Sequence, residues 1–291
     1  MIIVLTGPTG SGKTKVAIKL AQKLGGVIIN GDAFQVYKEL NIATAKPSFD
    51  EMMSVPHYLF DFIPLTSSYN VAEYQADLRG CIAELEKDGV PMIIAGGTVL
   101  YIRAGLYDYE FSENKPVDMS PFENKTTQEL HEFLEKIDPK SASMIHQNNR
   151  VRLLRAIEIY LQNGESKSEI EQRQTHKPIY DVSFFGLQHE RAPLYERVNQ
   201  RVDEMFEAGL VDENARLINK YGRERAGFKA IGVKELFPYF DGLISLEEAK
   251  ETIKKNTRNY VKRQETFFRH QFDIRWINDE NEILDALAKR D

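Results

Sequence analysis

The feature that most constrains the fold of this chain is a glycine-rich octapeptide near its start. Residues 7–14 read Gly-Pro-Thr-Gly-Ser-Gly-Lys-Thr and match the pattern G-x-x-x-x-G-K-[ST]. The apolar residues 1–6 before it are typical of a buried strand, and residues 13–24 carry apolar side chains at helical spacing. A strand that enters a helix through such glycines predicts a phosphate-binding loop at the edge of a parallel sheet.

Each residue type in the octapeptide has its own electrostatic task. Glycines let backbone N–H groups turn toward a phosphate, and the helix N-terminus adds partial positive charge. Lys13 neutralises phosphate oxygens, and the Thr14 hydroxyl can ligate Mg²⁺, the cofactor that we expect. The residues expected to bind a diphosphate or nucleotide are Gly7, Pro8, Thr9, Gly10, Ser11, Gly12, Lys13 and Thr14.

Strand and helix signals alternate along the rest of the chain. Short apolar runs at 26–30, 90–95 and 182–187 predict further strands, and the amphipathic stretch 71–87 predicts a helix between two of them. Strands that alternate with helices indicate a parallel sheet with right-handed crossovers. The fold class expected is therefore α/β, with a phosphate-loop parallel sheet flanked by helices.

The middle of the chain departs from this alternation. Residues 115–180 are first turn-rich and polar, then show helical periodicity at 129–137 and 151–161. We therefore expect a core domain formed by residues 1–114 and 181–291, with basic helices toward the C-terminus. The intervening residues form a smaller helical insertion domain.

Composition excludes several other classes of protein. The single cysteine, Cys81, can form neither an internal disulfide nor a cysteine-based zinc site, which is typical of a reducing compartment. The longest uncharged stretch, 89–102, falls short of the ~20 residues that a membrane span needs. No basic region precedes the apolar residues at the start, which argues against a signal peptide. We expect a cytoplasmic, monomeric protein with no membrane partner.

Charge is distributed unevenly along the chain. The net charge is −6, but residues 216–275 contain 14 Lys or Arg against eight Asp or Glu, a local excess of +6. The basic side chains of a predicted helix at 250–270 share one face, and they are Lys255, Arg258, Lys262 and Arg269. Its predicted apolar side consists of Ile253, Tyr260, Val261, Phe267 and Phe268. A solvated helix surface and a nucleic-acid contact both explain such an excess.

An acidic residue follows the second predicted strand. Asp32 lies where α/β sheets bind ligands, at the carboxyl edge, although an Asp at this point is also typical of a helix cap or an Asx turn. The next predicted strand runs into Gly96-Gly97-Thr98 and lacks the metal-holding Asp that hydrolysing phosphate-loop proteins carry. The residues themselves leave both interpretations of Asp32 open.

A series of short motifs resembles the tRNA dimethylallyltransferase family. After residues 7–14 come Asp32-Ala33-Phe34-Gln35-Val36-Tyr37-Lys38, Ala43-Thr44-Ala45-Lys46-Pro47 and Gly96-Gly97-Thr98-x-x-Tyr101. Later motifs are Arg152-x-x-Arg155-Ala156-x-Glu158, Arg197-x-x-x-Arg201, Gly232-Val233-Lys234-Glu235 and Thr257-Arg258-x-Tyr260-x-Lys262-Arg263-Gln264. Each motif is weak by itself, but their ordered series covers nearly the whole chain and is specific to the family. With Cys81 as its single cysteine, the chain cannot form the zinc finger of eukaryotic relatives, which indicates a bacterial-type member.

The resemblance implies a reaction. The family transfers a dimethylallyl group from dimethylallyl diphosphate to N6 of the adenine immediately 3′ of the anticodon in tRNA and releases diphosphate. By resemblance, Asp32 is the general base and Arg201 stabilises the leaving diphosphate. Thr98 contacts the target nucleotide near the donor, and Thr9 touches the diphosphate. Without the resemblance, the residues favour a solvated ion pair of Arg197 or Arg201 with Glu204 or Asp203 on one helix face.

The expected partner is the anticodon stem-loop of tRNA. The residues that the resemblance places along the tRNA path are Asp32, Ala33, Phe34, Gln35, Thr98, Val151, Arg152, Leu153, Leu154, Arg155, Lys229, Ala230, Ile231, Gly232, Val233 and Lys234. Arg258 and Lys262, on the basic helix face, complete the expected tRNA contacts.

Three other functions fit parts of the sequence. An adenylate isopentenyltransferase would use the same chemistry on free AMP, ADP or ATP, although it would not need a basic groove. A phosphate-loop small-molecule kinase would transfer a phosphoryl group from ATP. A non-catalytic RNA-binding module would use the basic helix alone.

Overall fold

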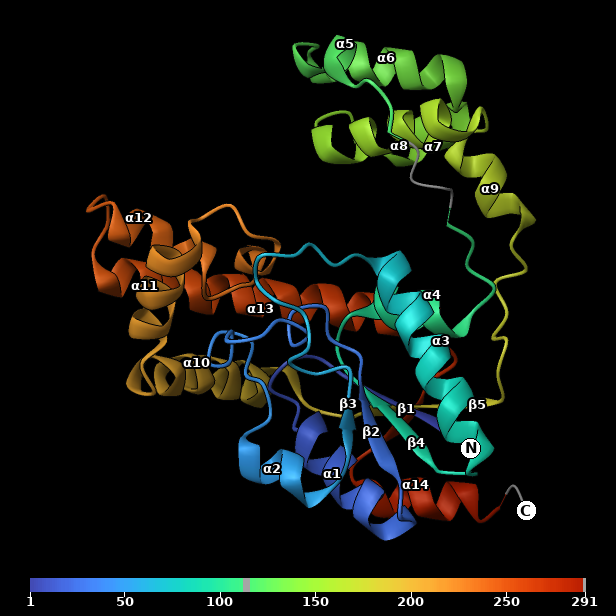
Figure 1. The fold of residues 1–291 in the computed structure, drawn as a ribbon, viewed down its shortest axis with the longest axis vertical. Helices are drawn as coiled ribbons and strands as arrows, with labels where there is room; N and C mark the ends of the chain where they lie inside the picture. The colour runs from blue at the N-terminus through green and yellow to red at the C-terminus, as the bar shows by residue number, and fades with distance from the viewer. Residues whose placement is uncertain (112–115, 290–291) are drawn as a thin grey trace. The chain divides into compact units, whose positions relative to one another are not determined.

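The computed structural model describes residues 1–111 and 116–289, which fall into two compact units (Figure 1). Unit 1 comprises Met1–Leu106 and Tyr180–Asp291 and contains the sheet. Unit 2 comprises Tyr107–Ile179 and is helical.

A parallel sheet of six strands forms the centre of unit 1. The strands are β1 (Ile2–Thr6), β2 (Val27–Asn30), β3 (His57–Tyr58), β4 (Met92–Ala95), β5 (Val182–Leu187) and β6 (Arg275–Ile277). They lie in the spatial order β3-β2-β4-β1-β5-β6. In register, Ile2 of β1 lies beside Met92 of β4 and Val182 of β5. Because the strands are parallel, the loops that follow β1, β2 and β4 meet at one edge of the sheet.

Helices cover both faces of the sheet, which explains why its strands are apolar on both sides. All five residues of β1 are buried. Ile3 and Leu5 share a core cluster with α1 (Lys13–Leu24) and α14 (Glu280–Leu287). Helices α3 (Val71–Lys87) and α4 (Val99–Leu106) pack against each other on the opposite side (Figure 1). The α/β fold class predicted from the sequence is confirmed.

The C-terminal part of unit 1 is a helical layer with its own core. Its elements are α10 (Arg191–Glu207), α11 (Leu210–Tyr221), the 3₁₀ turns η1 (Ala226–Lys229) and η2 (Lys234–Leu236), α12 (Phe237–Phe240) and α13 (Leu246–Gln271). Short helix α2 (Phe49–Ser54) lies between β2 and β3 in the sequence. Buried side chains of this layer pack with Val36, Tyr37 and Leu40, which follow β2. The loop after β2 is thereby anchored to the C-terminal helices.

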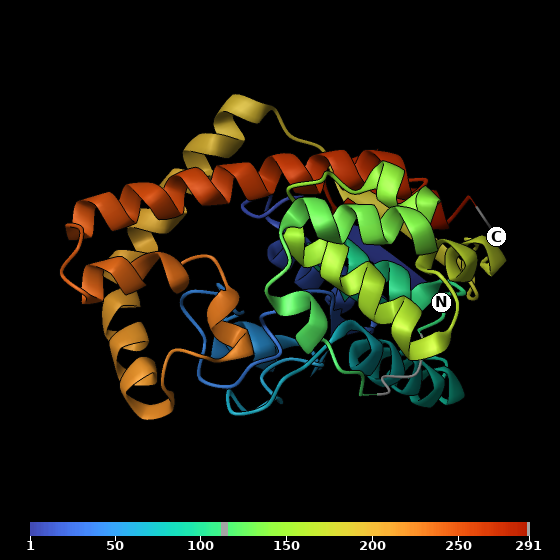
Figure 2. The ribbon, with the colours of Figure 1, turned by 90° about the horizontal axis from the view of Figure 1, so that it is seen from above.

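Helix α13 is the longest helix of the described chain and contains the predicted helix 250–270 (Figure 2). A capping box of Ser245 and Glu248 fixes its start, and it packs against α10 and η2. The expected apolar side is partly wrong, because Phe267 is 48% exposed whereas Phe268 is buried. Among the described helices, none combines the length with the apolar character needed to cross a membrane.

Unit 2 consists of five helices around a small apolar core. They are α5 (Ser120–Glu123), α6 (Thr127–Ile137), α7 (Pro139–Met144), α8 (Arg150–Asn163) and α9 (Lys167–Arg173). The buried Asp138 carboxylate accepts hydrogen bonds from the backbone N–H groups of Ser141 (2.9 Å) and Ser168 (3.1 Å). One carboxylate therefore joins the starts of α7 and α9.

Two sequence expectations about organisation differ from the structure. The compact unit begins at Tyr107, because Tyr107 bridges Pro178 and draws the two connecting segments together. The expected boundary between 114 and 115 lies outside the described residues. Strands β3 and β6, of two and three residues, are too short for a periodicity signal, and β6 lies where the sequence predicted mostly helix.

Candidate active site

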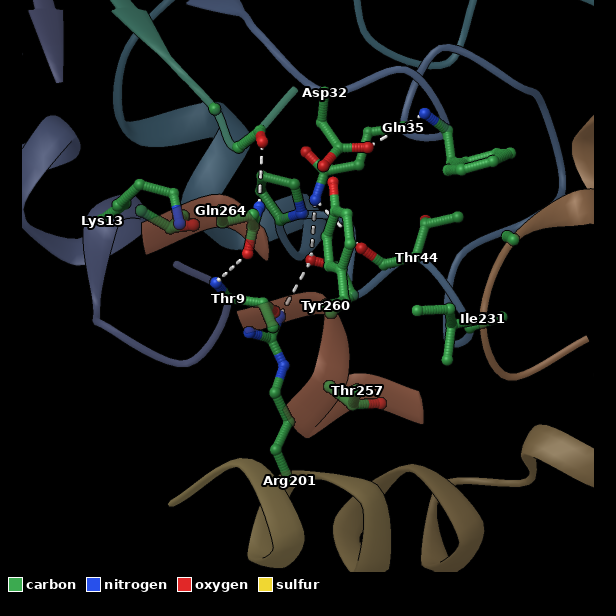
Figure 3. A pocket seen from close by; sticks show the side chains of 18 of the residues that line it. Thr9, Lys13, Asp32, Gln35, Thr44, Arg201, Ile231, Thr257, Tyr260 and Gln264 are labelled. Atoms are coloured by element: carbon green, nitrogen blue, oxygen red, sulfur yellow. Dashed lines mark hydrogen bonds between the residues drawn. The ribbon is translucent and has the colours of Figure 1, made fainter. Parts of the chain in front are cut away.

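A cavity of about 280 Å³ opens at the carboxyl edge of the sheet in unit 1 (Figure 3). The loops after β1, β2 and β4 contribute Thr9, Asp32 and Gly97 to its wall. Helices α10 and α13 contribute Arg201 and Tyr260 from the C-terminal layer. Residues far apart in the sequence therefore face one space.

The loop after β1 has a backbone that glycine adopts more readily than other residues. Gly10 and Gly12 have φ values of 78° and 90°. Gly12 is the N-cap of α1 and provides no side-chain oxygen to pair with the first N–H groups of that helix. Uncapped N–H groups at a helix N-terminus form a site that attracts anions. The geometry at residues 7–12 is therefore suited to a phosphate group.

Lys13 lies at the inner end of this loop and lines the cavity. Its Nζ donates a hydrogen bond to the carbonyl of Pro8 (2.8 Å). Burial and the neighbouring Arg201 lower the pKa of Lys13 to about 7, although Asp32 opposes this shift. An anion in the cavity would favour the charged ammonium.

Asp32 follows β2 and also lines the cavity. One of its carboxylate oxygens accepts a hydrogen bond from the backbone N–H of Phe34 (2.9 Å), which closes an Asx turn. Burial raises the pKa of Asp32 above its usual value, although the Phe34 hydrogen bond and the charge of Lys13 oppose this shift. A carboxylate with a raised pKa is a better proton acceptor near neutral pH. Asp32 thus forms the Asx turn that the structural interpretation predicted, and it also lines the cavity, as the ligand-binding interpretation required.

Arg201 extends from α10 into the same cavity (Figure 3). Its Nη2 donates a long hydrogen bond to the carbonyl of Ala45 (3.5 Å). Burial lowers the pKa of Arg201, and the nearby Asp32 and Glu204 carboxylates oppose that shift. Arg197, one turn earlier, is exposed. Asp203, one of the expected acidic partners, pairs with Lys250 and Lys254 instead. Arg201 brings positive charge into the cavity.

The side chain of Thr98 holds the backbone beside Asp32. Its Oγ1 accepts a hydrogen bond from the N–H of Ala33 (3.0 Å), and its own N–H donates to the carbonyl of Gly31 (3.0 Å). The Thr98 hydroxyl is thus engaged with the chain that carries the carboxylate. The catalytic role expected for Thr98 stays a prediction.

Gln264 is a cavity residue to which the sequence assigned no role. Its Oε1 accepts a hydrogen bond from the N–H of Thr9 (3.0 Å), and its Nε2 donates to the carbonyl of Gly97 (2.9 Å). A Cβ at Gly97 would lie 2.2 Å from Gln264 Nε2, so only glycine permits this approach. One side chain of α13 therefore joins the loops after β1 and β4. Its place in the last sequence motif was the only signal for it.

The remainder of the cavity wall is largely apolar. Tyr260, expected on the packed side of α13, faces the cavity instead, because α13 passes over the cavity rather than only over the core (Figure 3). Apolar side chains that line the cavity include Ala43, Val198, Val202, Met205, Ile231 and Ile253. The cavity can thus accommodate a charged group at one end and a small hydrocarbon group nearby.

The expected tRNA residues of unit 1 divide into cavity-lining and buried positions. Those that line the cavity are Asp32, Phe34, Gln35, Lys229, Ala230, Ile231 and Lys234. Gly232 and Val233 are buried, and the Gly232 N–H donates to Glu235 (2.9 Å). These two positions pack inside the helical layer, and their expected tRNA contacts stay predictions.

The basic face expected on α13 is only partly free for a partner. Lys262 is exposed, whereas Arg258 is half-buried and donates through Nη1 to Asn199 of α10. Lys255 and Arg269 are exposed as well. Lys262 is therefore the clearest candidate for a phosphate contact, while Arg258 also holds two helices together.

In unit 2, the expected segment lies in the first turns of α8. Val151 and Arg152 are exposed, Leu154 is half-buried and Arg155 pairs with Glu158 (2.6 Å). Leu153 is completely buried in the core of the unit, and its expected tRNA contact stays a prediction. The helical period of α8 directs this side chain inward.

Among the described residues, no three His, Cys, Asp or Glu side chains gather as a metal site. The expected Mg²⁺ ligand, Thr14, lines the cavity in the first turn of α1. Mg²⁺ commonly keeps several waters and combines one protein oxygen with the phosphate oxygens of a substrate. The donor set therefore fits a metal that arrives with a diphosphate.

The fold and cavity together define a class of protein: an α/β group-transfer enzyme with an anion-binding loop at the carboxyl edge of a parallel sheet. The IPP transferase family model matches residues 35–271. The tRNA dimethylallyltransferase of Anoxybacillus flavithermus is 45% identical over 95% of this chain and 90% of its own length. That of Bacillus subtilis is 41% identical over the same shares. This chain belongs to the tRNA dimethylallyltransferase family.

Solved structures agree with this assignment. The tRNA isopentenylpyrophosphate transferase of Staphylococcus epidermidis is 37% identical, with a TM-score of 0.74 over 100% of this chain and 99% of that one. A eukaryotic dimethylallyltransferase acting on tRNA is 27% identical, with a TM-score of 0.84 over 99% of this chain and 76% of that one. Neither the kinase nor the adenylate alternative is favoured by these relatives.

Proposed function

We propose that this protein transfers a dimethylallyl group from dimethylallyl diphosphate to N6 of the adenine immediately 3′ of the anticodon in tRNA, in the cytoplasm. The observation that carries the proposal is the single cavity in which an anion-binding loop, a carboxylate and an apolar wall meet. The N6 atom forms a bond to C1 of the dimethylallyl group as the bond from C1 to the diphosphate oxygen breaks. The N6 proton leaves to a base.

The departing diphosphate gains negative charge in the transition state, so fixed positive groups lower the barrier. The N–H groups of Gly10, of Gly12 and of the first turn of α1 donate hydrogen bonds to its oxygens, and Lys13 and Arg201 neutralise their charge. Burial lowers the pKa of Lys13, and the negative charge of a diphosphate would stabilise its ammonium form. The hydrocarbon lies against the apolar side chains of α10 and α13.

Asp32 is the proposed general base. An adenine N6 amine is a weak nucleophile, and its proton must leave as the C–N bond forms. Asp32 lines the cavity with Lys13 and Arg201, and its raised pKa makes it the stronger proton acceptor. The Asx turn with Phe34 fixes the direction of the carboxylate.

The Thr14 hydroxyl would hold Mg²⁺, which neutralises diphosphate oxygens when bound. The residues of the cavity wall bind the diphosphate and exclude water from C1. Lys229, Ile231 and Lys234 line the cavity, and they contact the RNA together with the exposed Lys262. A flipped-out base must enter from the RNA side for N6 to reach Asp32.

The acceptor distinguishes this function from its alternatives. Purified protein is incubated with labelled dimethylallyl diphosphate and with tRNA, AMP or ATP as acceptor. We expect label in tRNA and none in the nucleotides. Label in AMP alone would favour the adenylate enzyme, and phosphorylation of an acceptor by ATP without use of the prenyl donor would favour the kinase. As a matched control for Asp32→Asn, Asp88→Asn alters an exposed residue after α3 and should leave transfer unchanged.

A further inference from the structure

The buried amide of Asn30 holds the backbone of Asp32. Asn30 is the last residue of β2 and is completely buried. Its Oδ1 accepts a hydrogen bond from the N–H of Asp32 (2.8 Å), and its Nδ2 donates to the carbonyl of Asp32 (2.9 Å). One side chain therefore satisfies both polar backbone groups of the proposed base.

The peptide groups around Asp32 are held by other partners. The N–H of Gly31 donates to the carbonyl of Ala95 (2.8 Å), and the carbonyl of Gly31 accepts from the N–H of Thr98. The N–H of Ala33 donates to Thr98 Oγ1. The N–H and the carbonyl of Asp32 itself are hydrogen-bonded to the side chain of Asn30.

Two consecutive Asx turns carry the chain out of β2. In the first, the Asn30 side chain accepts from the N–H of Asp32, and in the second, the Asp32 side chain accepts from the N–H of Phe34. The first turn sets the position of the Asp32 backbone, and the second sets the direction of its carboxylate. The second turn depends on the first, because both share Asp32.

Asn30 is itself held from two sides. Its Nδ2 also donates to the carbonyl of Leu59 in the loop after β3 (3.0 Å), and its carbonyl accepts from the Tyr74 hydroxyl of α3 (2.7 Å). The side chain is thus fixed between β2 and the neighbouring loop, with no water-exposed surface. A buried group with this many hydrogen bonds is rigid.

We propose that Asn30 is a positioning residue for the reaction: it fixes the Asp32 carboxylate at the distance and angle needed to remove the N6 proton. This inference rests on the proposed function, because it requires Asp32 to be the base. Asn30 touches neither substrate. Its loss should therefore lower turnover while leaving the binding of both substrates intact.

Two substitutions separate the contributions of Asn30. Asn30→Leu keeps the branching of the side chain at Cγ, with a larger volume, and removes all its hydrogen bonds. Asn30→Ser retains an oxygen that can accept from the N–H of Asp32, since serine forms the same turn more weakly. Tyr74→Phe is the matched control, because it removes a hydrogen bond to the Asn30 backbone and leaves the amide of Asn30 in place.

The measured quantity is kcat divided by the number of functional diphosphate-binding sites, so that misfolded protein is not counted. The KM values for tRNA and for dimethylallyl diphosphate are measured in the same experiments. General-base catalysis contributes about 10²- to 10⁴-fold. We expect kcat of Asn30→Leu to fall about 100-fold or more, that of Asn30→Ser to fall between about three- and tenfold, and that of Tyr74→Phe to stay within about twofold. Both KM values should stay within about threefold of the wild type.

Several results would overturn the inference. One is a wild-type kcat in Asn30→Ser when Asn30→Leu fails to fold. A second is a fall in kcat in Tyr74→Phe as large as that in Asn30→Leu. A third is a fall in the number of functional diphosphate-binding sites that accounts for the whole loss of activity. If the wild-type protein transfers the prenyl group and Asp32→Asn does not, these results refute only the role of Asn30. If the wild-type protein transfers nothing to tRNA, the proposed function itself fails.

Discussion

The titration of Lys13 should control how tightly this protein holds a diphosphate. Burial and Arg201 lower its pKa from 10.5 to about 7. At about 1.4 kcal/mol for each pKa unit, burial and Arg201 together disfavour the charged ammonium by about 5 kcal/mol. A diphosphate must therefore bind with proton uptake whenever Lys13 is neutral beforehand.

The sign and size of the effect follow from this pKa. Below pH 7, Lys13 is already charged in the free protein, so its titration leaves affinity unchanged. Above pH 7, affinity falls by up to tenfold for each pH unit, and the Kd should rise about 50-fold between pH 7 and pH 9. At pH 7, binding should take up about half a proton.

Isothermal titration calorimetry with inorganic pyrophosphate tests this prediction. Proton uptake is obtained by repeating the titration in buffers of different ionisation enthalpy. Pyrophosphate titrates by itself, so Lys13→Met provides the baseline: it should bind more weakly and lose the part of the pH dependence that belongs to Lys13. An identical pH dependence of Kd in Lys13→Met and the wild type would refute the reasoning.

Three further substitutions probe other parts of the site. Lys262→Ala should weaken tRNA binding and reduce its salt slope by about one without changing pyrophosphate affinity, and an unchanged slope in a filter-binding titration would count against this contact. Gly97→Ala places a Cβ 2.2 Å from Gln264 Nε2 and should lower kcat/KM at least about tenfold, whereas Gly80→Ala, which has open space around it, should leave kcat/KM unchanged. Glu213→Gln replaces a carboxylate that accepts hydrogen bonds from three successive backbone N–H groups, so the free energy of unfolding in denaturant should fall by about 2 kcal/mol. A fall below about 0.5 kcal/mol would contradict this account.

The sequence predicted the parts of this molecule that have a local signal. The strand, glycine loop and helix from Ile2 to Leu24 follow from hydrophobic period and from the octapeptide, and both agree with the structure. The short strands β3 and β6 could not be predicted, because two or three residues are stabilised by their neighbours in the sheet rather than by their own pattern.

The candidate site was predictable only in part, for a similar reason. Lys13 is recognisable from the octapeptide and Asp32 from its place after an apolar strand. Gln264 is joined to Thr9 and Gly97 by tertiary hydrogen bonds, and no spacing rule in the sequence identifies those partners. Asn30 forms a local Asx turn with Asp32, but its hydrogen bond to Leu59 is also tertiary. The burial of Leu153 shows that a segment-level resemblance does not distinguish the buried from the exposed face of a helix.

The measurement that tests the central claim most directly is single-turnover transfer to tRNA by wild-type protein and by Asp32→Asn, with both substrates bound beforehand. Nuclease digestion and mass spectrometry then locate the product. The account predicts a dimethylallyl group on the adenine beside the anticodon with the wild type. Asp32→Asn should be at least about 100-fold slower while both substrates bind within about threefold of wild-type affinity. Transfer by Asp32→Asn at the wild-type rate, or a product on any other base, would contradict it.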